Sequence, residues 1–88
     1  MDIITDAIID DDIYMIDFYT SNDRILIIKN EKYFELSVET DNGDYQFYSI
    51  KVKTIENLIV KIYDILDKYY IVYIKLNGES VVYKNPTG

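Results

Sequence analysis

Residues 54–69, TIENLIVKIYDILDKY, have the clearest secondary-structure pattern in the chain. Thr54 is a good N-cap, Glu56 suits the positive end of a helix dipole, and Lys68 suits the negative end. The apolar side chains recur at three- and four-residue intervals, a spacing that predicts an amphipathic α-helix packed against a core. This stripe comprises Leu58, Ile59, Ile62, Ile65, Leu66 and Tyr69. We therefore predict a helix over residues 54–69.

Four segments before this helix have the pattern of β-strands. They cover residues 12–20, 24–29, 32–39 and 45–53 and are rich in the branched and aromatic residues that favour strands. Alternation is clearest in the third segment, where Phe34, Leu36 and Val38 share one face. The turns between the segments are short, and the Asn-Gly pair at 42–43 is typical of a hairpin. We predict an antiparallel meander of about four strands over residues 12–53.

The segments on either side complete the predicted fold. Residues 70–85 form a closing hairpin around the Asn-Gly pair at 77–78, residues 86–88 form a tail, and residues 1–11 form an acidic arm or a short helix. The order predicts a single α+β domain over residues 1–88. It contains an antiparallel β-sheet, made of the meander of about four strands, then one helix, then the closing β-hairpin, with the helix packed on one face.

The charge of the chain is concentrated at its beginning. Residues 1–23 contain seven aspartates and no basic residue, whereas residues 24–88 contain nine basic and nine acidic residues. The net charge of −7 therefore lies in the first quarter of the sequence. Such a protein repels nucleic acid and anionic membranes, because both are bound through lysine and arginine. It attracts basic partners, and the long-range attraction accelerates their encounter.

The side chains most used in catalysis at neutral pH are missing. The chain has no histidine and no cysteine, so disulfides, thiolate metal sites and histidine-dependent acid–base chemistry are excluded. Its three glycines fit no phosphate-binding or dinucleotide-binding loop. The triplet Asp10, Asp11 and Asp12 could ligate Ca²⁺ or Mg²⁺, but the glycine and glutamate of a calcium loop do not follow at the required spacing. We expect no enzyme, no cofactor and no metal site.

We predict that the acidic stretch, together with nearby tyrosines, binds a partner protein. The predicted site residues are Asp2, Asp6, Asp10, Asp11, Asp12, Asp17, Asp23, Tyr14 and Tyr19. Carboxylates two residues apart in a strand lie ~6.6 Å apart, and those four apart in a helix rise by ~6 Å, close to the separation of phosphates along a nucleic-acid strand. Tyrosine is enriched at energetically important interface positions. The alternative interpretation is a solubilising acidic face with tyrosines that pack internally.

In its size, acidity, lack of cysteine, richness in Asp, Tyr and Ile, and α+β order, the chain resembles the small phage-encoded anti-CRISPR and DNA-mimic inhibitors. The resemblance includes no shared motif, so it assigns no site residues. It implies a non-enzymatic inhibitor that binds a basic nucleic-acid-binding protein, such as a nuclease or a CRISPR effector. Such an inhibitor blocks or mimics DNA or RNA and binds no nucleic acid directly.

Two other functions fit the same residues. An immunity or antitoxin-type protein would cap a basic toxin through the same charges. A structural, homo-oligomerising protein would use an exposed sheet edge or aromatic face. No apolar run approaches the ~20 residues of a membrane span, and the beginning of the chain lacks the basic segment of a signal peptide. We therefore expect no membrane partner and a cytoplasmic location, in the host cytoplasm if the protein is phage-encoded.

Overall fold

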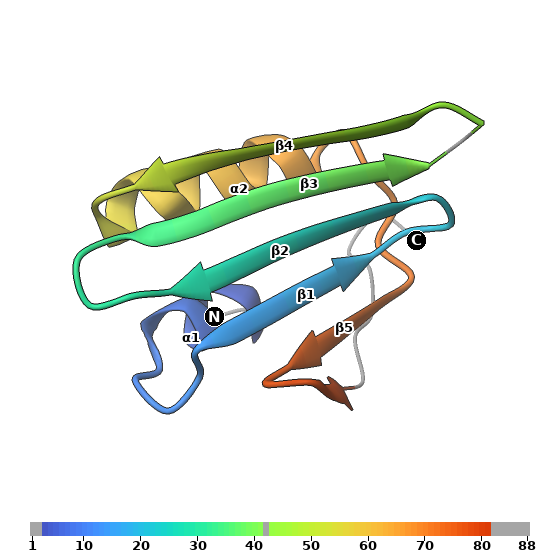
Figure 1. The fold of residues 1–88 in the computed structure, drawn as a ribbon. Coiled ribbons are helices and arrows are strands. Elements are labelled where there is room, and N and C mark those ends of the chain that lie inside the picture. Colours follow the sequence, from blue (N-terminus) through green and yellow to red (C-terminus); the bar gives the residue numbers. More distant parts are fainter. Residues whose placement is uncertain (1–2, 42, 82–88) are drawn as a thin grey trace.

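The computed structural model describes residues 3–41 and 43–81. Figure 1 shows a single sheet with both helices on the same side of it. The elements, in chain order, are α1 (Ile3–Ile9), β1 (Met15–Tyr19), β2 (Asp23–Lys29), β3 (Phe34–Asp41), β4 (Tyr45–Val52), α2 (Ile55–Leu66), β5 (Tyr73–Leu76) and β6 (Glu79–Val81).

The six strands pair in the order β4-β3-β2-β1-β5-β6, and every pair is antiparallel. The first four strands form the meander, because their short turns allow neighbouring strands to pair directly. The chain then leaves the edge strand β4, returns along one face as α2, and adds β5 beside β1. As a result β1, which follows the acidic residues in sequence, lies in the interior of the sheet between β2 and β5.

One apolar core lies between the sheet and the two helices. Leu58 and Ile62 of α2 are buried in it, together with Ile4, Ala7 and Ile8 of α1. The sheet supplies alternate residues, namely Ile16, Phe18, Ile25, Ile27, Leu36, Val38, Val52 and Ile74. Each fully buried side chain of this size contributes about 1.5–3 kcal/mol relative to leaving it exposed. Within residues 3–41 and 43–81, no helix covers the opposite side of the sheet, which we call the open face.

The α+β class and the antiparallel sheet are confirmed, with corrections in the helices. For residues 1–11 we left open an acidic arm or a short helix, and the structure forms the helix α1, which buries one side. The described residues therefore contain two helices, and the predicted order had counted only the second. We also predicted that the second helix continues to residue 69, but it ends at Leu66. The reason is local: the N–H of Lys68 donates to Ile65 and that of Tyr69 to Leu66, so the chain tightens into three-residue turns.

Strand boundaries also differ by up to three residues, most at the starts of the first and fifth strands. The first strand begins at Met15 and not at residue 12, because residues 10–12 form a turn after α1. The fifth strand begins at Tyr73 and not at residue 70, because only from Tyr73 onward does the chain pair with β1. The predicted hairpin continues to residue 85, and its positions after Val81, like the tail, lie outside the described residues.

Candidate functional site

The chain passes from α1 to β1 through three exposed aspartates, Asp10, Asp11 and Asp12, which we call the acidic loop. The N–H of Asp10 donates to the carbonyl of Asp6 at 3.0 Å, so the loop begins as a continuation of the helix. The Asp10 carboxylate oxygen Oδ1 then accepts the N–H of Asp12 at 2.9 Å. This is a local side-chain turn of the kind that aspartate favours. It leaves the side chains of Asp11 and Asp12 pointing to solvent.

Lys29, at the end of β2, holds the loop from one side. Its Nζ donates to the carbonyl oxygens of Ala7 and Asp10, both at 2.8 Å. These carbonyls belong to the last turn of α1 and its continuation, where the helix dipole is negative. The carbonyl of Asp10 also accepts the N–H of Ile13 at 3.1 Å. Partial burial lowers the pKa of Lys29 from its ordinary 10.5, whereas the charges of Asp10 and Asp11 act to raise it. The lysine therefore compensates for the unfavourable position of aspartates at a helix C-terminus.

Replacing Lys29 with methionine should lower the free energy of unfolding by about 1 kcal/mol at neutral pH, because the carbonyls of Ala7 and Asp10 each lose one hydrogen bond. The measurement is urea denaturation followed by circular dichroism. Lys32→Met provides the control, since Lys32 is exposed in the β2–β3 turn and should change stability by less than about 0.5 kcal/mol. Equal losses in the two variants would contradict the role assigned to Lys29.

The stability difference between wild type and Lys29→Met should also change with pH in the alkaline range. Because the pKa of Lys29 is lower in the folded chain, the unfolded chain holds this proton more tightly as the pH approaches 10.5. The contribution of Lys29 to stability should therefore rise with pH between its lowered pKa and 10.5. The difference between wild type and Lys29→Met isolates it from the tyrosines, whose titration is common to both. If the stability difference between the two proteins instead falls as the pH rises toward 10.5, the predicted direction is wrong.

Asn77, in the β5–β6 turn, holds the loop from the other side. Its Oδ1 accepts the N–H groups of Tyr14 at 2.9 Å and Met15 at 3.2 Å. Its Nδ2 donates to the carbonyl of Asp12 at 2.9 Å. Its own N–H donates to the carbonyl of Met15 at 2.8 Å. The residue has φ = +52°, a left-handed conformation that asparagine tolerates better than most residues. The acidic loop is thus fixed between two strands that are distant in sequence.

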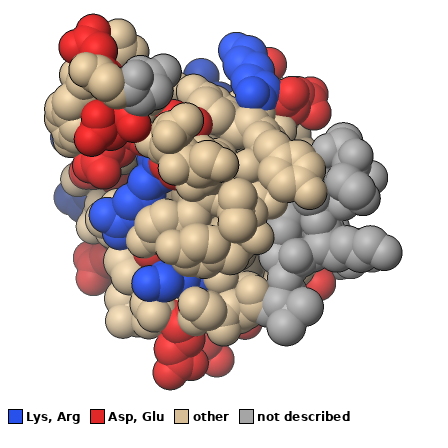
Figure 2. All heavy atoms as spheres, turned by 90° about the vertical axis from the view of Figure 1, so that its right-hand side faces the viewer, with Lys and Arg blue, Asp and Glu red and all other residues tan. Residues whose placement is uncertain are grey.

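The other predicted acidic residues do not join one surface. Asp6 is exposed on α1, one helical turn before the acidic loop. Asp23 is the first residue of β2 and lies near the opposite end of β1, where its Oδ2 accepts the Thr20 hydroxyl at 2.8 Å. Acidic and basic side chains are interspersed over that end of the molecule (Figure 2). Asp2 lies outside the described residues. The structure therefore groups Asp6 with the acidic loop and separates Asp23 from them.

Asp17 is only 2% exposed, although it points to the open face. Its Oδ1 accepts hydrogen bonds from both Nη2 and Nε of Arg24, each at 2.7 Å, across the β1–β2 pair. Burial acts to lower the pKa of Arg24, but the hydrogen bond and charge of Asp17 outweigh it and raise the pKa above its ordinary value. This carboxylate is neutralised within the protein and offers no charge to a partner.

The two predicted tyrosines lie at opposite ends of β1. Tyr14 is exposed beside the acidic loop, with its backbone N–H held by Asn77. Tyr19 stacks on Tyr73 with ring centroids 4.5 Å apart and planes inclined by 8°. Lys75 also lies over the Tyr19 ring, with its Nζ 5.5 Å from the centroid. Tyr14 is available as an anchor next to the acidic loop, whereas Tyr19 is already packed against its neighbours.

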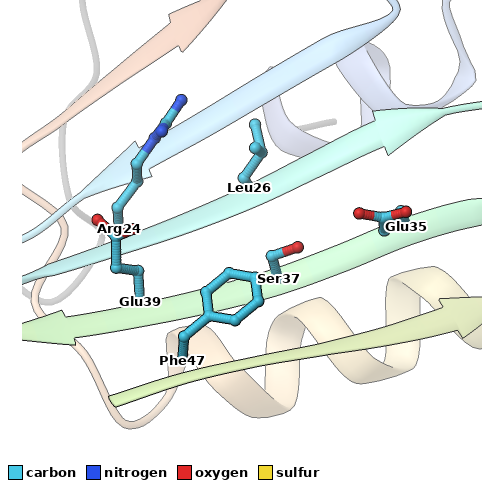
Figure 3. Close-up of a pocket in the computed structure, with 6 residues that line it drawn as sticks. All are labelled: Arg24, Leu26, Glu35, Ser37, Glu39 and Phe47. Carbon is cyan, nitrogen blue, oxygen red and sulfur yellow. The ribbon is translucent and has the colours of Figure 1, made fainter. Parts of the chain in front are cut away.

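The open face also contains a shallow hollow that the sequence did not indicate. Figure 3 shows the side chains around it, which come from β2, β3 and β4 and comprise Arg24, Leu26, Glu35, Ser37, Glu39 and Phe47. Its volume is about 160 Å³, below the roughly 300–1,000 Å³ of typical ligand pockets. Arg24 is engaged by Asp17, and Glu39 accepts the Tyr45 hydroxyl at 3.0 Å. The hollow therefore does not favour a small-molecule site.

Two further properties bear on function. In residues 3–41 and 43–81, no three acidic side chains come together in a way that could hold a metal ion. None of the helices in the same ranges is long and apolar enough to cross a membrane. The chain matches no protein-family model, and the comparisons with curated proteins and with solved structures gave no significant match either.

Proposed function

We propose that this protein is a non-enzymatic inhibitor that binds a basic nucleic-acid-binding protein through the acidic loop, in the manner of anti-CRISPR and DNA-mimic inhibitors. The observation that supports the proposal is the fixed geometry of the loop. Lys29 donates to the carbonyl of Asp10 and Asn77 donates to that of Asp12, so the loop backbone is held from both sides. Three further side-chain hydrogen bonds from the same two residues fix the chain on either side of the loop. A carboxylate held in place loses less entropy on binding than one on a mobile tail.

The charge distribution around the loop supports the same function. Asp6, Asp11 and Asp12 have no basic partner within the described residues, whereas Asp17 is neutralised by Arg24. Lys29 lies next to the loop, but its ammonium is directed at backbone carbonyls. The exposed carboxylates are therefore available to the lysines and arginines that a nucleic-acid-binding protein uses for phosphates. Tyr14 supplies an exposed aromatic ring beside them.

Reversing two of these charges tests the proposal. Asp11→Lys with Asp12→Lys should weaken binding about thirtyfold at low salt, since several close charge pairs across the interface become repulsive. Asp10 is left intact because its carboxylate closes the turn. The immobilised wild-type chain is exposed to a bacterial lysate, and the retained proteins are identified by mass spectrometry. Each purified candidate is then tested for loss of DNA or RNA binding when the wild-type chain is added.

The control variant carries the same change of charge elsewhere. Asp44→Lys with Asp64→Lys alters two exposed acids on the β3–β4 turn and on α2, and it should bind as wild type does. The proposal requires a captured protein that binds nucleic acid and is inhibited by the wild type but not by the loop variant. Equal inhibition by the loop variant would refute it. Capture of a toxin that handles no nucleic acid would instead favour the immunity-type function.

A further inference from the structure

β4 forms one edge of the sheet, and the described residues provide no strand on its outer side. The strand is eight residues long and pairs with β3 in unbroken register, so no bulge or proline interrupts the edge. Three aromatic side chains project from it, with Tyr45 60%, Phe47 57% and Tyr48 51% exposed. Proteins normally protect such edges with short strands, bulges, prolines or several charges, because unpaired backbone groups bind other strands. An edge of this kind is suited to pairing with another strand.

The local charge indicates which strand would pair with β4. Residues 45–53 contain no acidic residue and two lysines, Lys51 and Lys53, in a chain whose net charge is −7. Acidic residues elsewhere on the surface repel a second copy, whereas this segment contributes no negative charge to that repulsion. We propose that two copies of this chain pair antiparallel along β4 and join their sheets into one. The proposal concerns a surface that does not include the acidic loop.

The sequence of β4 is self-complementary in this arrangement. The aromatic residues Tyr45 and Phe47 lie in its first half, Lys51 lies near its end, and Lys53 directly follows it. All four are on the open-face side of the alternation, so a two-fold axis at Ser49 places Phe47 opposite Lys51 and Tyr45 opposite Lys53. The neighbouring registers on either side still place a lysine opposite one of the two rings. No lysine faces a lysine in any of these registers.

Contacts within the chain show that these lysines reach aromatic rings. The Nζ of Lys51 lies 4.9 Å from the centroid of the Tyr33 ring, which is the geometry of a cation–π contact. A parallel pairing would lose the complementarity, because it would bring lysine opposite lysine and ring opposite ring. The pairing of one strand buries less than the ~800 Å² per partner of a standard interface, so we expect a weak, concentration-dependent dimer.

Two substitutions of opposite charge at Phe47 test whether the β4 strands pair and whether they pair antiparallel. Phe47→Lys places a cation opposite Lys51 or Lys53 of the second copy and should raise the dimer dissociation constant about tenfold or more. Phe47→Glu places an anion opposite the same lysines and should leave the dimer at least as stable as in the wild type. Sedimentation velocity over a wide range of concentrations measures both, and circular dichroism verifies that each variant is folded.

Val60→Lys is the matched control, because Val60 is an exposed apolar residue on α2 and not on the β4 strand. It should leave the dissociation constant unchanged. A chain that stays monomeric at every concentration would overturn the proposal. So would equal weakening by Phe47→Lys and Phe47→Glu, which would indicate a nonspecific apolar contact. A dimer that neither substitution alters would place the interface on another surface.

Discussion

Replacing Arg24 with alanine should lower the free energy of unfolding by about 3 kcal/mol, because it leaves a buried carboxylate without its partner. Asp17 is 2% exposed, and the guanidinium holds it through two contacts of 2.7 Å. Removing one member of a buried ion pair typically costs about 3–5 kcal/mol. The lower end applies here, since the Arg24 side chain is 37% exposed and water can partly take its place.

Urea denaturation measures this loss, and two further variants define its cause. Lys68→Ala removes an exposed ion pair with Asp64, whose atoms are 3.8 Å apart, and should cost less than about 0.5 kcal/mol. The double variant Asp17→Leu with Arg24→Leu should recover most of the stability lost by Arg24→Ala, because no charge stays buried. If Arg24→Ala costs no more than Lys68→Ala, Asp17 does not depend on Arg24.

Replacing Asn77 with alanine should lower the free energy of unfolding by about 2–3 kcal/mol. The substitution removes three side-chain hydrogen bonds to Asp12, Tyr14 and Met15, each with a net value of about 1 kcal/mol. It also places alanine at φ = +52°, where a Cβ without a local hydrogen bond is strained. Thermal and urea denaturation measure the loss, and hydrogen exchange of the amides of Tyr14 and Met15 locates it.

Asn77→Gly separates the two contributions, because glycine relieves the strain but makes no side-chain bond. It should be more stable than Asn77→Ala and less stable than the wild type. Both variants should also weaken binding of the partner, although neither changes a carboxylate of the acidic loop. Unchanged exchange at Tyr14 and Met15 in Asn77→Ala would show that the acidic loop is held by other contacts.

Much of the fold was predictable from local pattern. The alternation of Phe34, Leu36 and Val38 identified the buried face of β3, and the stripe containing Leu58 and Ile62 identified the buried side of α2. These periods are properties of neighbouring residues, so they can be recognised without the tertiary structure. The boundaries were less predictable, because the ends of β1 and β5 depend on where the two strands pair with each other.

Less of the candidate site was predictable. The acidic loop was recognised as charged, but nothing near it in sequence indicates Lys29, which bonds to Ala7 across 22 positions. Asn77 reaches Asp12 across 65 positions, and on sequence evidence it was only a turn residue. The hollow on the open face likewise depends on three strands brought together by the meander. Each of these features depends on contacts between distant segments, which no local window contains.

The sequence by itself determined the helical and strand periods, the antiparallel meander, and the concentration of negative charge in the first quarter of the chain. The tertiary structure alone decided which of those charges reach solvent. It buries Asp17 against Arg24, exposes Asp11 and Asp12, and places Asp23 at the far end of the sheet. It also decided that β4 lies at an edge of the sheet, with no strand of the described residues on its outer side. The reason is physical: charge and periodicity belong to single residues and their neighbours, whereas burial and pairing depend on which distant segments come into contact.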